Sequence, residues 1–266
     1  MNPPFLTVVA GPNGSGKSTL INHLIRKGVD FGRYINADDI ARENSWTGDE
    51  GARKAQAEAN RLREEYLTAG IDFSFETVMS HPSKIEVMAR ARSAGYFVTL
   101  FFVATSDPVL NLERVQARVA LGGHDVPKDR VLARYHRTLE LLPQAIAACD
   151  KCLVFDNSSE GLAQSAEHLR PVAMAERVSV DRIRLQFMPP TPRWALRASE
   201  LAAAGFAIRE LHVIPVPAKR VYADYEALAT GQPGNSEASQ RRLLENGLEH
   251  LNFGKPFAFS NLGKIE

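Results

Sequence analysis

Short apolar runs alternate with helical patterns over the first 160 residues of the chain. The spacing of apolar and polar positions between the runs predicts helices over Lys17–Lys27, Asp49–Ala69, Pro82–Ala94, Pro108–Val119 and Pro127–Cys149. The runs themselves predict strands over Phe5–Ala10, Tyr34–Asn36, Asp72–Glu76, Phe97–Ala104 and Cys152–Asp156. Because they are apolar at consecutive positions, we expect both faces of each strand to be buried. This alternation is typical of an α/β fold with a parallel sheet flanked by helices.

The pattern changes after residue 157. Two loosely alternating segments predict a hairpin, and three further segments predict helices. These segments are Val172–Val178 and Asp181–Phe187 for the hairpin, and Gly161–Leu169, Trp194–Ala204 and Glu237–His250 for the helices. A proline-rich joint at 188–192 lies among them. We therefore expect a main domain over 1–187 and a small C-terminal appendage over 188–266.

Composition narrows the class of protein. The 266 residues are 44% hydrophobic and 24% charged, and the net charge is +1, which is typical of a globular protein and argues against a nucleic-acid partner. The longest apolar runs fall short of the ~20 residues of a membrane-spanning helix, and the N-terminus has no basic start of a signal peptide. We therefore expect a cytoplasmic protein with no membrane contact. Cys149 and Cys152 have the spacing of a metal or redox pair, but buried packing is the simpler interpretation.

A phosphate-binding loop comes directly after the first predicted strand. The segment matches G-x-x-x-x-G-K-[ST] and opens a helix, as this motif requires. Backbone N–H groups of such a loop and of the helix N-terminus hold phosphates. Lys17 would reach the β- and γ-phosphates of ATP, Ser18 would bind Mg²⁺ and Thr19 would lie near the α-phosphate. The expected nucleotide-binding residues are Gly11, Pro12, Asn13, Gly14, Ser15, Gly16, Lys17, Ser18 and Thr19.

Other motifs restrict the kind of P-loop protein. The sequence has no Asn-Lys-x-Asp motif of guanine recognition, no Ser-Gly-Gly-Gln signature of transporter ATPases, and no apolar strand followed by Asp-Glu. The chain after the phosphate-binding loop is instead typical of a small-molecule kinase, whose second substrate lies across the strand ends.

Carboxylates come after the second and third predicted strands. Asp38 would take the proton from an attacking hydroxyl, and the alternative is that Asp38 or Asp39 simply caps a helix that begins at Ile40. Glu76 closes a buried strand, where it would hold a magnesium-bound water or a substrate hydroxyl, and the alternative is a solvated strand end. Thr77 and Ser80 would form a polar wall beside it.

Arginines flank a Gly-Gly joint at residues 122–123. Arg114 and Arg118 lie one turn apart on the predicted helix before it, and three more lie on the next helix at Arg130, Arg134 and Arg137. Such a cluster predicts a lid that closes on phosphates and stabilises the transferring group. The alternative interpretation is a solvated, charged helix pair.

These motifs together resemble the zeta-toxin family of P-loop kinases, above all in Gly-Gly-His-Asp-Val-Pro before the Arg-Tyr helix. The resemblance covers roughly residues 5 to 160. It implies a nucleotide-kinase-like fold and phosphorylation of UDP-N-acetylglucosamine or a related UDP-sugar. It also implies an antitoxin protein as a possible partner.

The resemblance also implies roles for single residues. Asp38 would be the general base, and Lys17, Arg114 and Arg118 would steady the γ-phosphate. Arg118, Arg130 and Arg134 are interchangeable candidates for phosphate contact, and we place Arg134 on the substrate side. The sugar would lie against Glu76 and Thr77, and the adenine near Asp156, Asn157 and Ser158.

Two other functions stay open at this point. One is a nucleoside or nucleic-acid kinase, which the basic pairs of the C-terminal segment weakly permit. The other is a nucleotide-binding regulatory module that acts through that segment.

Overall fold

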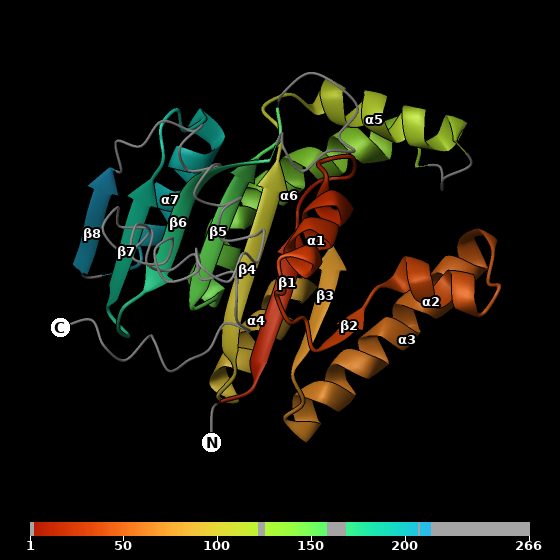
Figure 1. Ribbon diagram of the computed structural model, residues 1–266, viewed down its shortest axis with the longest axis horizontal. Helices are drawn as coiled ribbons and strands as arrows, with labels where there is room; N and C mark the ends of the chain where they lie inside the picture. The colour runs from red at the N-terminus through yellow and green to blue at the C-terminus, as the bar shows by residue number, and fades with distance from the viewer. Residues whose placement is uncertain (1–2, 122–125, 159–168, 207, 214–266) are drawn as a thin grey trace, which may run out of the picture.

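The computed structural model describes residues 3–121, 126–158, 169–206 and 208–213 (Figure 1). Its centre is an eight-stranded sheet in the order β2-β3-β1-β4-β5-β6-β7-β8. The strands are β1 Phe5–Ala10, β2 Arg33–Ile35, β3 Phe73–Thr77, β4 Phe97–Ala104, β5 Lys151–Asp156, β6 Arg170–Arg177, β7 Arg182–Phe187 and β8 Ile208–Val213. The helices are α1 Lys17–Arg26, α2 Ala37–Glu43, α3 Gly48–Ala69, α4 Ser83–Ser93, α5 Pro108–Ala120, α6 Lys128–Ala148 and α7 Arg193–Ala203.

The first five strands run parallel, as the apolar runs predict. Both faces of β1, β3, β4 and β5 are buried, whereas Arg33 and Tyr34 of β2 are exposed because β2 lies at the edge of the sheet, so the expected burial of both faces is wrong for β2. Along β4, Leu100 and Phe102 pack into one apolar cluster, whereas Phe101 and Val103 pack into a second cluster on the other face. The second cluster contains Leu20 of α1, and α4 and α6 contribute to the first. The predicted α/β fold with a central, mostly parallel sheet is therefore confirmed.

Strands β6 and β7 form the predicted antiparallel hairpin. The sheet does not end there, because β8 pairs in parallel with β7, from Arg182 opposite Ile208 to Phe187 opposite Val213. Helix α7 connects the two strands and packs against α6, β6 and β7. Within the described residues, a βαβ unit of β7, α7 and β8 therefore spans the joint at 188–192, where we expected a domain boundary. The predicted helix over Glu237–His250, most of the helix at Gly161–Leu169 and the rest of the appendage lie outside the described residues.

Charged side chains cross the C-terminal half of the sheet as a ladder. Lys151 of β5 is in register with Glu176 of β6, Glu176 with Arg184 of β7, and Arg184 with Glu210 of β8. Arg184 lies 3.4 Å from Glu176 and 2.9 Å from Glu210. Such cross-strand pairs stabilise one register of the strands.

The carboxyl ends of β1–β5 meet at one edge of the sheet, because these strands are parallel. The phosphate-binding loop, the start of α2, and the residues after β3, β4 and β5 all lie there, and α5 extends beyond the same edge (Figure 1). Open α/β sheets bind their ligands at this edge.

Candidate active site

A cleft of about 1440 Å³ opens at the carboxyl edge of the sheet. The phosphate-binding loop lines one part of it, and α2, α3, the end of β3, α4, α5 and α6 line other parts. A single small ligand occupies roughly 300–1,000 Å³ in protein pockets, so this cleft has room for a nucleotide and a second substrate.

The phosphate-binding loop has glycines at three crowded positions, Gly11, Gly14 and Gly16, and the first and last of them illustrate the reason. A Cβ atom at Gly11 would lie 2.0 Å from the Val103 carbonyl oxygen, and one at Gly16 would lie 2.4 Å from the Asn157 amide nitrogen. Gly16 also has φ +99°, which side chains rarely adopt. Gly16 is the N-cap residue of α1 and has no side chain to occupy the N–H groups of the first turn, which suits them to bind phosphate.

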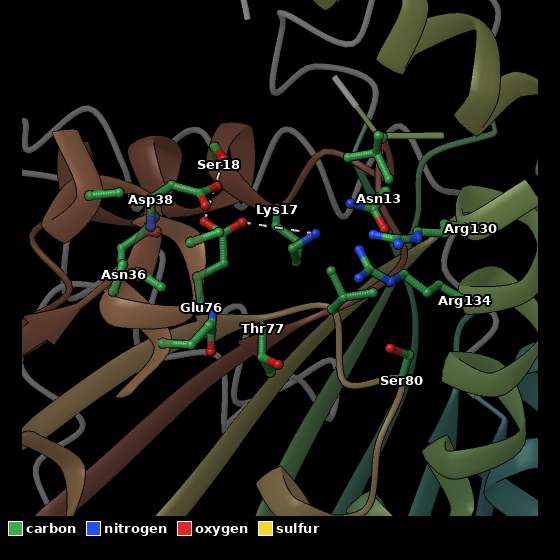
Figure 2. Close-up of a pocket in the computed structure, with 18 of the residues that line it drawn as sticks. Asn13, Lys17, Ser18, Asn36, Asp38, Glu76, Thr77, Ser80, Arg130 and Arg134 are labelled. Atoms are coloured by element: carbon green, nitrogen blue, oxygen red, sulfur yellow. Dashed lines mark hydrogen bonds and ion pairs between the residues drawn. The ribbon is translucent and has the colours of Figure 1, made fainter. Parts of the chain in front are cut away.

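Lys17 is buried at the floor of the cleft. Its Nζ donates to the carbonyl oxygen of Pro12 at 3.0 Å and lies 3.8 Å from a carboxylate oxygen of Glu76 (Figure 2). Burial lowers the pKa of Lys17, Glu76 and Asp38 oppose that shift, and Arg118 adds to it. A phosphate of ATP would give this buried ammonium the negative partner that its burial makes favourable.

Glu76 connects the phosphate-binding loop with β2. Its carboxylate accepts hydrogen bonds from Ser18 Oγ at 3.4 Å and from the Tyr34 hydroxyl at 3.3 Å. Hydroxyl and carboxylate oxygens are ligands suited to Mg²⁺, which usually keeps several waters and binds substrate phosphates as well. No group of three His, Cys, Asp or Glu residues in the described parts of the chain would hold a metal. Ser18 and Glu76 therefore fit a magnesium ion shared with nucleotide phosphates.

Asp38 projects into the cleft from the first turn of α2 (Figure 2). The helix begins at Ala37, not at Ile40, and its N-cap is Asn36, whose side chain accepts from the Asp38 N–H at 2.9 Å. The capping role considered for Asp38 and Asp39 is therefore wrong. Asp39 pairs with Arg42 at 2.6 Å, whereas the exposed Asp38 carboxylate faces the cleft.

The five predicted arginines differ in their position relative to the cleft. Arg118, Arg130 and Arg134 line the cleft, and Figure 2 shows Arg130 and Arg134 on the α6 side, across from Asp38. Arg114 also lines the cleft, but it is buried and donates to the carbonyl oxygen of Asn157 at 2.9 Å. Arg137 is exposed, donates to the carbonyl oxygen of Ala133 at 3.2 Å and does not line the cleft. The Gly-Gly joint lies outside the described residues.

The segment after β5 supports the phosphate-binding loop. Asn157 donates its side-chain amide to the Ser15 carbonyl oxygen at 2.9 Å. Asp156 pairs with Arg170 at 2.9 Å and accepts from Ser158, which in turn accepts from the Ser106 N–H at 2.8 Å. These contacts hold the segment that the resemblance places near adenine.

The polar residues predicted after β3 line the cleft. Thr77 lines the cleft and its Oγ1 accepts from the Met79 N–H at 3.0 Å, which forms a turn after β3. Ser80 lies beside it in the cleft.

Cys149 and Cys152 are free, buried thiols, as the packing interpretation expects.

Three residues of the cleft region were not predicted. Asn111 donates to the Asn13 carbonyl oxygen at 2.6 Å and so positions the phosphate-binding loop from α5. Arg63 and Lys84 line the cleft from α3 and α4. A signal for Arg63 exists in the sequence, because it continues a buried stripe of small residues spaced four apart. The stripe consists of Gly51, Ala55, Ala59 and Arg63.

No helix in the described part of the chain is both long and apolar enough to cross a membrane. A model of the zeta toxin family matches residues 2–163. An uncharacterized protein of Haemophilus influenzae is 33% identical over 129 residues, which are 47% of this chain and 88% of that protein.

Solved structures with a similar fold include one from the PezAT chromosomal toxin-antitoxin system of Streptococcus pneumoniae. It is 14% identical and has a TM-score of 0.41, over 59% of this chain and 69% of that chain. Shikimate kinase from Acinetobacter baumannii in complex with shikimate is 14% identical and has a TM-score of 0.36, over 60% of this chain and 87% of that one.

Proposed function

The chain belongs to the zeta toxin family and is a P-loop kinase, and from this we infer that it transfers the γ-phosphoryl group of ATP to a sugar hydroxyl. The observation that carries this inference is the arrangement of one cleft. The phosphate-binding Lys17, the solvent-facing carboxylate of Asp38 and the cleft-facing Arg134 lie around the same space (Figure 2). Phosphoryl transfer requires such a combination of phosphate cradle, base and cations.

Asp38 is the residue best placed to activate the acceptor. Its carboxylate takes the proton of the attacking hydroxyl, the hydroxyl oxygen forms a bond to the γ-phosphorus, and the bond from that phosphorus to the β-γ bridging oxygen breaks. ADP leaves with the electron pair of that bond. Asn36 supports this role because it is the N-cap of α2, so the Asp38 side chain does not serve as the cap.

Cations around the cleft would stabilise the charge of the transferring group. Lys17 would leave the Pro12 carbonyl for the β- and γ-phosphates, and Arg118, Arg130 and Arg134 would approach them from α5 and α6. We assign Arg114 a supporting role instead, since its guanidinium holds the Asn157 carbonyl.

Magnesium would be held by Ser18, with Glu76 on one of its waters. When bound, it neutralises charge on the β- and γ-phosphates. Glu76 also restrains Lys17 and Ser18 before the nucleotide arrives, because it contacts both side chains.

The acceptor that we propose is UDP-N-acetylglucosamine or a related UDP-sugar, with Glu76 and Thr77 near the sugar. Family membership supports this choice, and the room left in the cleft beside a nucleotide is compatible with it.

The experiment is a transfer assay with ATP, Mg²⁺ and a panel of UDP-sugars, free sugars, nucleosides and oligonucleotides, read by mass spectrometry. We expect one added phosphate on a UDP-sugar, absent with Lys17→Ala. Phosphate on a nucleoside or oligonucleotide would replace the acceptor assignment. ATP binding without any phosphorylated acceptor would contradict the transferase function and favour a regulatory module.

An antitoxin protein is the proposed macromolecular partner, and this proposal rests on family membership. Its test is expression of the chain in a bacterial host. We expect growth arrest with the natural sequence and normal growth with Asp38→Asn, and normal growth with both would contradict a toxin role.

A further inference from the structure

Two basic side chains line the cleft on the face of β3 that is turned away from the phosphate-binding loop. Arg63 of α3 lies with its guanidinium carbon 5.1 Å from the ring centroid of Phe75. Phe75 and Glu76 are successive strand residues and point to opposite faces. Glu76 contacts Lys17 and Ser18, so Arg63 lies on the opposite face, where α3 and α4 pack.

Asn60 is the shared hydrogen-bond partner of both cations. Its Oδ1 accepts from Lys84 Nζ at 3.0 Å and also from the Arg63 guanidinium. A neutral amide oxygen therefore stands where a carboxylate would normally compensate two positive charges. Among the described residues, no carboxylate lies within ion-pairing distance of Arg63 or Lys84, and the nearby Glu64 is engaged by Arg90 at 2.5 Å.

Such an arrangement is costly without an anion. Arg63 is only 4% exposed, and a buried cation needs a negative partner to offset lost hydration. Burial lowers the pKa of Arg63 to about 10, and burial together with Arg63 lowers the pKa of Lys84 to about 8. Both groups still carry their charge at neutral pH, so the cleft presents two cations side by side.

The geometry places the phosphates of ATP elsewhere, since Lys17 and the N-terminus of α1 form the phosphate cradle on the other face of β3. We propose that Arg63 and Lys84 bind an anionic group of the phosphoryl acceptor, a phosphate, diphosphate or carboxylate. This inference rests on the proposed function. It adds which residues hold the anionic group of the acceptor, and it places them on the face of β3 opposite the phosphate-binding loop.

The binding experiment uses protein saturated with Mg²⁺ and a non-hydrolysable ATP analogue, so that the phosphate-binding loop is occupied. Inorganic pyrophosphate, inorganic phosphate and acetate are then titrated by calorimetry. We expect at least one of them to bind, and its identity distinguishes a diphosphate, a monophosphate or a carboxylate. Lys84→Met and Arg63→Gln should each weaken that binding by about tenfold, the usual loss for one charge-assisted hydrogen bond.

Matched controls separate this site from general charge and from folding. Arg61→Gln removes a charge two residues from Arg63, on the exposed side of the same helix, where it pairs with Glu58 and Glu65. It should leave anion binding unchanged. Lys84→Arg and Arg63→Lys keep the charge and should retain most of the affinity, and thermal unfolding reports whether each variant folds.

The outcomes are distinct from those of the transfer assay, since the titration needs no turnover. No anion binding by the loaded wild-type protein, or equal binding by Lys84→Met, would overturn the anion site even if a kinase activity is found. Anion binding that depends on Lys84 would support the site even if none of the tested acceptors is phosphorylated.

Discussion

Asn157 donates its side-chain amide to the carbonyl oxygen of Ser15 at 2.9 Å, which connects the end of β5 to the phosphate-binding loop. The two residues are 142 positions apart in the chain. Arg114 adds a second contact, because it donates to the Asn157 carbonyl oxygen. The conformation of the phosphate-binding loop therefore depends on a strand that lies two places away from β1 in the sheet.

Gly16→Ala tests this dependence. The added Cβ would lie 2.4 Å from Asn157 Nδ2 at a backbone conformation with φ +99°, so the loop or Asn157 must move. We expect ATP affinity to fall by about tenfold or more, as for a strain of roughly 1–3 kcal/mol. Gly28→Ala is the control, because Gly28 also has a positive φ but meets nothing within 4 Å. Equal ATP affinity in both variants, measured by calorimetry, would contradict the crowding argument.

Asp38→Asn tests the general base. The amide keeps the size of the side chain but accepts no proton, so kcat should fall by roughly 10²–10⁴-fold while ATP affinity stays the same. Asp39→Asn is the matched control, since Asp39 is the next residue and pairs with Arg42. A similar loss in both variants would indicate an effect of charge or helix stability instead of catalysis.

Arg134→Ala tests the cations of α6. Arg134 lines the cleft and Arg137 does not, although both are on the same helix. We expect Arg134→Ala to lower kcat by roughly 10²-fold, the size of effect seen when one preorganised donor is lost, and Arg137→Ala to leave it unchanged. Steady-state kinetics with saturating ATP checks this. Loss of activity in Arg137→Ala alone would reverse the assignment of the helix faces.

Lys151 predicts a pH dependence of folding stability. Burial lowers its pKa to about 8, partly opposed by Glu176, whereas the unfolded chain has the ordinary value of 10.5. Between these values the unfolded state binds more protons, so stability rises with pH across this window and is flat below it with respect to this group. The free energy of unfolding of the wild type should gain about 2 kcal/mol relative to Lys151→Met between pH 7 and pH 10. Urea unfolding of both proteins at both pH values measures this gain. An equal change in the free energy of unfolding of the wild type and of Lys151→Met would contradict the prediction.

Much of this fold could be predicted from the sequence because the central strands β1, β3, β4 and β5 are buried on both faces. In Phe97–Ala104 every residue except Thr99 is then apolar, and the phosphate-binding motif fixes where the first such strand ends. The start of α2 was missed because Asn36, Asp38 and Asp39 are all good capping residues. Only the backbone conformation of Asn36, with φ −131° and ψ 121°, distinguishes the cap from its neighbours.

The parts of the cleft that could not be predicted depend on contacts between distant segments. Arg63 and Lys84 meet at Asn60 only because α3 and α4 lie on the same side of β3. The proline-rich joint at 188–192 resembled a linker, but pairing of β8 with β7 depends on hydrogen bonds that leave no local pattern. Sequence periodicity reports the burial of a segment and does not identify its neighbour in the sheet.

The position of β8 has a consequence for shortening the chain. A protein that ends at residue 187, the boundary expected from the joint, would lose β8 and leave the N–H and C=O groups of β7 without partners along one side. It would also leave Arg184 without Glu210. Unpaired N–H and C=O groups along the edge of a sheet can pair with a strand of another chain. We therefore expect this truncated protein to self-associate, although it keeps every residue of the phosphate-binding loop, and light scattering would measure this.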